Sequence, residues 1–222
     1  MPIETSGRRP LKTRDWPIFK NLAAWLARNG ATPNAISFMS IVFGCLAGAA
    51  LATTARVEGW TQRGCWLAAA ACIQLRLIAN LLDGMVAVEG RKGGPVGDLW
   101  NEAPDRISDA AIFIGAGYAA GSEPVLGYAA ALVAVFVAYI RALGASVGVG
   151  QIFLGPQAKQ QRMAVMTAAC VLSAVLPADR WPGGLQPALY LKVALLAVIV
   201  GGIVTAWRRL ARIAALLREK AH

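Results

Sequence analysis

Two short segments of this sequence carry oxygen-bearing side chains at helical spacing within apolar surroundings. Asn80 and Asp83 are three residues apart, and Asn101 and Asp105 are four residues apart. Side chains three or four residues apart lie on one face of an α-helix. Carboxylate and amide oxygens are the ligands that Mg²⁺, Mn²⁺ and Ca²⁺ prefer. If the two helices are antiparallel neighbours, we expect their polar faces to form an oxygen-lined cup for a divalent ion.

Gly84 directly follows Asp83 and has no side chain that would block the approach of a ligand. A divalent ion held by carboxylates beside such a position is a common means of binding a diphosphate. The only histidine is His222, the last residue of the sequence. Any general base at this site is therefore expected to be a carboxylate.

A simpler interpretation is that these charges form ion pairs that merely join two helices. Two sets of partners suit it: Arg76 with Asp83, and Arg106 with Glu102 or Asp109. An ionisable group within a membrane span costs roughly 2.5–3.5 kcal/mol on insertion scales, and is by default a sign of function. Because many polar groups lie on two facing stripes, we favour a functional site.

The composition predicts an all-α, polytopic membrane protein. Of the 222 residues, 57% are hydrophobic and 15% are charged, and the mean hydropathy is +0.52. Soluble domains carry about a quarter charged residues. Apolar runs of about 20 residues are long enough to cross a bilayer. We expect six transmembrane helices, at residues 34–55, 65–88, 96–120, 124–147, 163–175 with their flanks, and 189–207.

An amphipathic helix at the membrane interface is expected before the first span, at residues 15–28. Apolar residues recur there at helical spacing on one face. Trp16 and Trp25 are typical of the boundary between membrane and water. Thr32 and Pro33 predict the N-cap and the first turn of the next helix.

The net charge of +10 is concentrated between the apolar runs. The positive-inside rule explains this distribution without nucleic acid, and contact with anionic lipids follows from it. Both termini are then cytoplasmic, and the expected location is a bacterial inner membrane. We divide the chain into a cytoplasmic N-terminus (1–33), a transmembrane catalytic domain (34–207) and a basic cytoplasmic tail (208–222), which we expect to lie on anionic lipid as an amphipathic helix.

The spacing of the polar residues resembles the signature of the CDP-alcohol phosphotransferase family. That signature reads D-x-x-D-G-x-x-A-R, then eight residues, then G-x-x-x-D-x-x-x-D. Five positions of this sequence match it: Asp83, Gly84, Ala87, Gly97 and Asp105. The family's six spans and its N-terminal interfacial helix agree with the elements expected above.

Three positions depart from the signature. Asn80 and Asn101 replace its first and third aspartates, and Val88 replaces its arginine. In the family, four acids hold two divalent ions, so the loss of two negative charges is expected to weaken metal binding. Because the rest of the signature is intact, the paired change indicates a subfamily variant. Three nearby acids stay open as replacements: Asp98, Glu102 and Asp109.

The resemblance implies a membrane enzyme of phospholipid synthesis. It would move a phosphatidyl group from a CDP-linked donor, expected to be CDP-diacylglycerol, to the hydroxyl of a polar alcohol with release of CMP. It also implies Mg²⁺ or Mn²⁺ as cofactor and a homodimer. Asp105 would be the general base, and the metal ligands would be Asp83, Asp105, Asn80 and Asn101. The nucleotide contacts would be Asn34, Asn80, Asp83, Gly84, Ala87 and Gly97.

The acceptor site is expected to be basic. Arg141 lies inside the fourth span, where an arginine needs an anionic partner. Lys159 and Arg162 precede the fifth span and, with Arg106, could bind a phosphate on the acceptor. Family enzymes that use inositol phosphate or glycerol phosphate are similar in this respect. Ordinary positive-inside charge remains an alternative for Lys159 and Arg162.

Two other functions stay open. A catalytically inactive relative that only binds CDP-lipid would account for Asn80 and Asn101. A small transporter would account for acids within the membrane, but these acids gather at one face instead of the midplane. The sequence also lacks the related halves that transporters often show.

Overall fold

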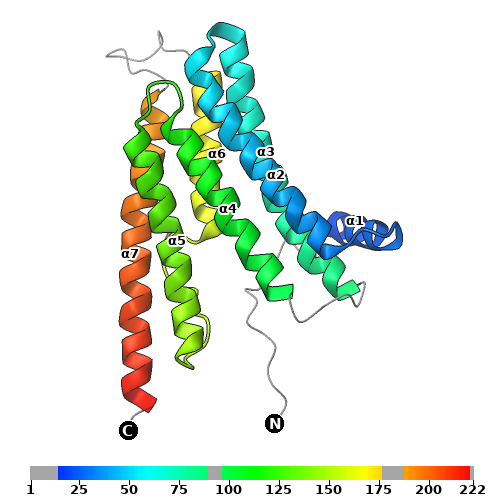
Figure 1. The fold of residues 1–222 in the computed structure, drawn as a ribbon, viewed down its shortest axis with the longest axis vertical. Coiled ribbons are helices and arrows are strands. Elements are labelled where there is room, and N and C mark those ends of the chain that lie inside the picture. The colour runs from blue at the N-terminus through cyan, green and yellow to red at the C-terminus, as the bar shows by residue number, and fades with distance from the viewer. Residues whose placement is uncertain (1–14, 90–96, 177–187, 221–222) are drawn as a thin grey trace.

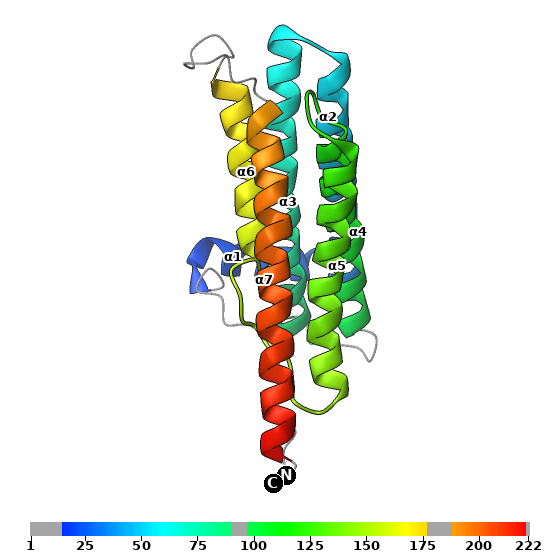
Figure 2. The same ribbon diagram turned by 90° about the vertical axis from the view of Figure 1, so that its left-hand side faces the viewer.

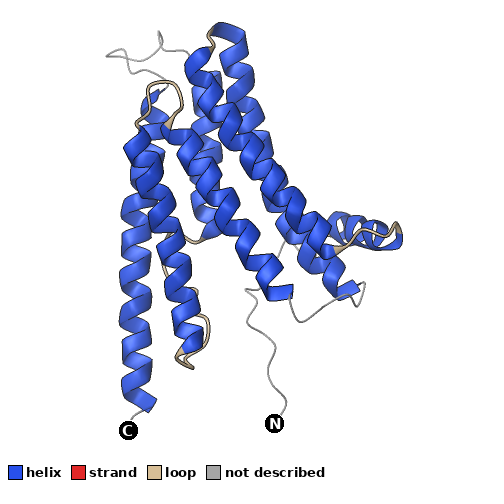
Figure 3. Cartoon of the chain, viewed as in Figure 1, coloured by secondary structure: helices blue, strands red, loops and turns tan. Residues whose placement is uncertain are grey.

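The computed structural model describes residues 15–89, 97–176 and 188–220. These ranges contain helices and loops and no β-strand (Figure 3). A 3-10 turn, η2 (Thr54–Arg56), follows the second helix. The α-helices of the described ranges are α1 (Pro17–Arg28), α2 (Pro33–Thr53), α3 (Gly59–Glu89), α4 (Gly97–Gly117), α5 (Pro124–Ser146), α6 (Lys159–Val175) and α7 (Ala188–Lys220).

Helices α2 to α7 run along the bundle, and α1 lies across the lower ends of α2 and α3, on the right in Figure 1. Figure 2 shows α6 beside both α3 and α7. The six long helices match the six expected segments in position. The first turn of α2 begins as predicted, because the Thr32 hydroxyl accepts a hydrogen bond of 3.2 Å from the backbone N–H of Ala35.

Four of the described helical segments are long and apolar enough to cross a membrane. They are Pro33–Arg56, Gly59–Val88, Pro124–Ser146 and Leu189–Lys220. Helix α6 has only 17 residues, and the first half of α4 carries much of the buried charge described below. Length and composition therefore support membrane insertion of the bundle through four helices.

Helix α1 is two residues shorter than expected and packs against the end of α3. Its buried Ala23 contacts a cluster that contains Leu82 and Val86 of α3. The flanking Trp16 and Trp25 are exposed. This contact places α1 directly beside the α3 segment that carries Asp83.

Helix α7 continues without a break from Ala188 to Lys220, so the boundary expected after Trp207 falls inside one helix. Its 33 residues correspond to roughly 50 Å, well beyond the hydrocarbon thickness of a bilayer. The additional length packs against α5, where Ile213 joins a small core with Val137 and Ile140. Residues 208–220 are therefore an extension of the last helix and not the separate surface helix that the basic pattern suggested.

Small residues bring the backbones of α2 and α4 into direct contact. A Cβ atom on Gly48 would lie 2.3 Å from the carbonyl oxygen of Ala111, and one on Gly44 would lie 2.6 Å from Cβ of Ser108. Ser108 also donates a 3.1 Å hydrogen bond to the carbonyl of Ser40. Such positions allow close helix packing in membranes.

Helix α2 consequently packs along both α3 and α4, which touch each other only over a short stretch. Helices α3 and α4 are antiparallel, as expected for the second and third spans, but they are not packed closely along their length (Figure 1). Helix α4 approaches α2 more closely than it approaches α3, because α2 presents small residues to it and α3 presents larger side chains. Long polar side chains, described below, still connect the polar faces of α3 and α4.

We predict that Gly48→Val lowers the stability of the bundle by about 1–3 kcal/mol or more, because the added side chain must force α2 and α4 apart. Gly64→Val is the matched control, since a Cβ on this α3 glycine meets nothing within 4 Å. Thermal unfolding in detergent micelles measures both. Equal melting temperatures for the two variants would contradict the described contact.

Candidate active site

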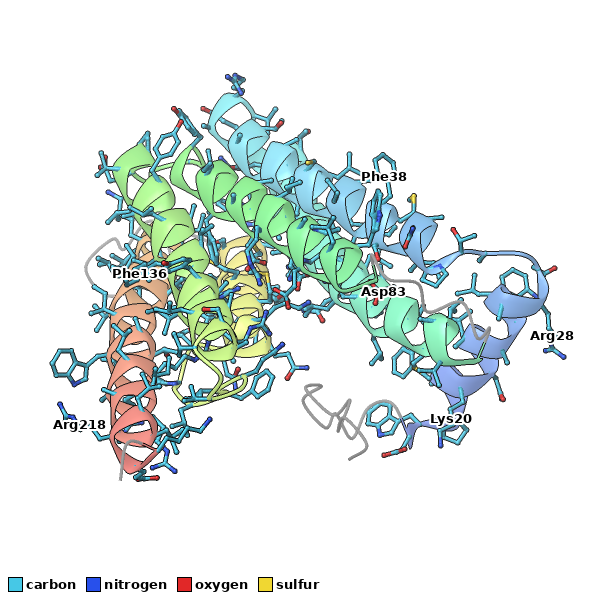
Figure 4. All side chains as sticks on the ribbon, turned by 60° about the horizontal axis from the view of Figure 1, so that its bottom comes forward. Lys20, Arg28, Phe38, Asp83, Phe136 and Arg218 are labelled. Atoms are coloured by element: carbon cyan, nitrogen blue, oxygen red, sulfur yellow. The ribbon has the colours of Figure 1, made fainter. Side chains whose placement is uncertain are left out.

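Three helices contribute to a buried polar cluster in the lower half of the bundle. Figure 4 shows Asp83 on the inward side of α3, whereas Phe38 on α2 points away from the bundle. The cluster consists of Arg76, Asn80 and Asp83 from α3, Asp105 and Asp109 from α4, and Lys159 and Arg162 from α6. The polar faces of the second and third predicted spans therefore meet as expected, and α6 completes the cluster.

Asp105 is the most heavily contacted carboxylate of this cluster. Its Oδ1 accepts hydrogen bonds from Nδ2 of Asn80 at 2.6 Å and from Nη2 of Arg76 at 3.2 Å. Its Oδ2 accepts a hydrogen bond of 2.6 Å from Nζ of Lys159. Two cations and an amide thus hold a nearly buried carboxylate in one orientation.

Asp83 has a different environment, although it lies only one helical turn from Asn80. Its Oδ2 accepts a 2.8 Å hydrogen bond from the hydroxyl of Ser37 on α2. Its Oδ1 is buried and has neither a hydrogen bond nor an ion pair. A Cβ on the adjacent Gly84 would meet nothing within 4 Å, so α3 is open at the residue that follows Asp83.

Ser37 was not identified from the sequence. A serine within an apolar span commonly bonds to its own helix, and the Ser37 hydroxyl does lie 3.1 Å from the carbonyl of Pro33. Its position one turn into α2, after the Thr32 cap, is the signal that could have pointed to it. Asn34, the expected nucleotide contact in that turn, is exposed.

Asp109 is a structural charge and not an available metal ligand. Nη2 of Arg76 forms an ion pair with it at 2.6 Å, and Arg162 donates a hydrogen bond to its other oxygen. All three side chains are buried. Arg76 therefore joins Asp105 and Asp109, because α4 presents two carboxylates at i and i+4 to the same guanidinium. The pairing of Arg76 with Asp83, which belonged to the simpler ion-pair interpretation, is not formed.

A second charged group lies between α4 and α5. Glu102 accepts hydrogen bonds from Arg106 and, at 2.5 Å to each oxygen, from Nη2 of Arg141. Arg141 thus has the anionic partner that its place in a span requires, and its guanidinium lies 5.8 Å from the ring centre of Phe153. The pairing of Arg106 with Glu102 agrees with the structural alternative drawn from the sequence.

Glu102, Arg106 and Arg141 line a pocket of about 400 Å³, a volume suited to a small ligand. Tyr139 and Gln151 add polar groups to its wall. The four basic residues expected at an acceptor site are therefore divided. Arg106 and Arg141 line this pocket, whereas Lys159 and Arg162 are bonded to Asp105 and Asp109.

The described residues fit one divalent ion better than two. Among them, no three side chains of His, Cys, Asp or Glu are close enough to hold a metal together. The unpartnered Oδ1 of Asp83 and the space beside Gly84 are the features suited to an ion. Ala87 is half-buried on the same helix. Gly97 begins α4, and the side chains of Asp98 and Asn101 lie outside the described residues.

The fold is similar to that of phosphatidylinositol phosphate synthase (PgsA1) from Mycobacterium tuberculosis. The structure with CDP-DAG bound has a TM-score of 0.70 and 23% identity, over 89% of this chain and 94% of that chain. The complex with manganese and citrate gives 0.69 and 23%, over 88% of each chain. The apo form gives 0.65 and 24%, over 86% of this chain and 93% of that chain.

At this level of identity the likeness establishes a shared fold. No protein-family model matches the sequence. No curated protein matches it either. The described part of the chain is thus an α-helical bundle that shares the fold of these structures.

We predict that Asp109→Asn destabilises the protein by about 3–5 kcal/mol, because it removes a buried charge that two buried arginines share. Glu123→Gln is the control, since Glu123 forms an exposed pair with Lys192 and should change stability by less than about 1 kcal/mol. Thermal unfolding compares them. An Asp109→Asn variant as stable as Glu123→Gln would show that the three charges do not join the helices.

Proposed function

We propose that this chain is a CDP-alcohol phosphotransferase, which moves a phosphatidyl group from CDP-diacylglycerol to a polar, phosphorylated alcohol. One observation carries the proposal: the buried Oδ1 of Asp83 has no hydrogen-bond partner, the next residue, Gly84, leaves open space, and both share a motif of matching spacing with Asp105. A synthase of the same fold has been solved with CDP-DAG bound. A structure of that synthase also contains manganese.

The donor would bind at the α3–α4 end of the cluster. Asp83 would hold a single Mg²⁺ or Mn²⁺, with the amide oxygens of Asn80 and Asn101 as neutral ligands. When bound, the ion neutralises charge on the diphosphate and stabilises the leaving oxygen. Gly84 leaves room for the phosphates. Three further residues would contact the nucleotide: Asn34, Ala87 and Gly97.

Asp105 would act as the general base. The acceptor oxygen forms a bond to the β-phosphorus, the bond from that phosphorus to the bridging oxygen breaks, and CMP leaves with the electron pair. The hydroxyl proton passes to a carboxylate oxygen of Asp105. The bonds from Asn80, Arg76 and Lys159 fix the direction of this carboxylate. Orientation of this kind is a large part of what a general base needs.

The acceptor would enter from the pocket between α4 and α5. Arg106 and Arg141 already bind a carboxylate there, that of Glu102, and the same donors suit a phosphate. An acceptor phosphate would displace Glu102 from the pair. This arrangement favours a phosphorylated polyol over a neutral alcohol. The structure with a similar fold is that of a phosphatidylinositol phosphate synthase.

The same proposal includes the arrangement in the membrane. All six long helices would span the bilayer, with α1 at the cytoplasmic interface and both termini cytoplasmic. Helix α1 lies at the lower ends of α2 and α3, and α7 ends below them (Figure 1). A bacterial inner membrane and a homodimer complete the proposal. The exposed apolar side chains along α5 and α7 are suited to lipid or to a second copy.

An inactive relative that binds CDP-lipid is the second candidate, and Asn80 is the observation that favours it. An amide at this position cannot contribute charge to a metal. The two candidates share nucleotide binding and differ in the release of CMP.

We predict that CDP binds to the purified protein only with Mn²⁺ or Mg²⁺, and that Asp83→Asn weakens this binding at least tenfold. The substitution preserves shape and removes the charge that faces the ion. Asp15→Asn is the control, because Asp15 is exposed before α1. Isothermal titration measures both. Unchanged affinity in Asp83→Asn, or no binding with any metal, would contradict the proposed donor site.

A further inference from the structure

We propose that the ammonium group of Lys159 takes the place of one of two divalent ions, so that this site binds a single ion, at Asp83. The inference rests on the proposed function and deepens it. It follows from the contacts of Asp105, from the charge balance of the cluster and from the identity of residue 80.

The first observation is that Asp105 has little capacity left for a metal. A carboxylate offers about four lone-pair sites. Lys159, Asn80 and Arg76 occupy three of them. Lys159 reaches Asp105 from the first residue of α6, so the cation is built into the fold and does not come from solvent.

The second observation is the charge balance. The carboxylates of the cluster are Asp83, Asp105 and Asp109, and the cations are Arg76, Lys159 and Arg162. Among the described side chains of the cluster, three negative and three positive charges therefore balance without any metal. Two divalent ions would add four positive charges, and a diphosphate with about two negative charges would compensate only half of them, which is unfavourable in a largely buried cluster. A single ion adds only two positive charges, and the bound diphosphate compensates them.

The third observation explains why residue 80 is asparagine. Its amide nitrogen lies 2.6 Å from Asp105 and donates a hydrogen bond to it. An aspartate at this position would face Asp105 across the same distance, and two carboxylates so close require a cation between them. Asn80 removes that requirement. The amide of Asn80 and the ammonium of Lys159 together stabilise the Asp105 carboxylate, as a bridging ion would.

Lys159 can also contact the ligand. An ammonium group has three donors, and the bond to Asp105 uses one. The Lys159 side chain is 29% exposed, so it is accessible from the open side of the cluster. Its remaining donors can therefore bind a phosphate oxygen, as a metal ion would. Lys159 is thus assigned to the reacting phosphates, and the acceptor phosphate is left to Arg106 and Arg141.

The experiment counts Mn²⁺ bound per chain by electron paramagnetic resonance of the free ion, with purified protein in detergent and saturating CDP. The wild-type chain should bind one Mn²⁺. Asn80→Asp combined with Lys159→Gln adds a negative charge and removes a positive one, and should bind two. Lys192→Gln is the matched control, because Lys192 also pairs with a carboxylate but lies far from the cluster, and it should bind one.

Two Mn²⁺ per wild-type chain would overturn the inference and leave the proposed function intact. A count of one in a double variant that melts like the wild type would also overturn it. If the double variant does not fold, the wild-type count decides alone. Absence of both Mn²⁺ and CDP binding would overturn the proposed function itself, so the two failures are distinguishable.

Discussion

The balance of charge around Asp105 is the constraint on which the site depends. This carboxylate belongs to α4, its partners Arg76 and Asn80 belong to α3, and Lys159 belongs to α6. A buried charge is tolerated only when it is paired and hydrogen-bonded. The helices must therefore approach until these bonds form, and the direction of the Asp105 carboxylate is fixed by the same contacts. The geometry proposed for proton transfer is thus a consequence of packing.

The packing of α2 makes this arrangement possible. Its glycines admit the backbone of α4, and its Ser37 donates to Asp83. One helix therefore both supports α4 and orients the carboxylate proposed to hold the ion. Asp83 keeps one free oxygen because the cations of the cluster are already taken by Asp105 and Asp109. The cluster therefore has one carboxylate that is available to an ion, that of Asp83, and two that connect the helices, those of Asp105 and Asp109.

Features that depend on local spacing could be predicted from the sequence. The helices, the Thr32 cap and the polar stripes that carry Asn80 and Asp105 all follow from neighbours three or four residues apart. Features that depend on how helices pack could not. Nothing in the local pattern shows that α2 lies along both α3 and α4. The course of α7 beyond Trp207 was also missed, because basic residues that suit a lipid surface equally suit a helix packed on α5.

The partners of the basic residues in the site also depend on helix packing and not on local sequence. The sequence places Arg141 inside an apolar run and Lys159 before one, and it assigns both to the acceptor. The approach of α6 brings Lys159 to Asp105, and the approach of α5 brings Arg141 to Glu102. Only the packing of whole helices separates a residue proposed to act at the donor phosphates from one proposed to bind the acceptor.

The release of CMP from CDP-diacylglycerol by the purified protein, with Mn²⁺ and a set of phosphorylated polyols, tests the central claim most directly. We expect release that requires both the metal and an acceptor, and that falls by roughly 10²–10⁴-fold in Asp105→Asn, which keeps the shape of the side chain but removes the base. Release that persists in Asp105→Asn, or no release with any acceptor, would contradict the account.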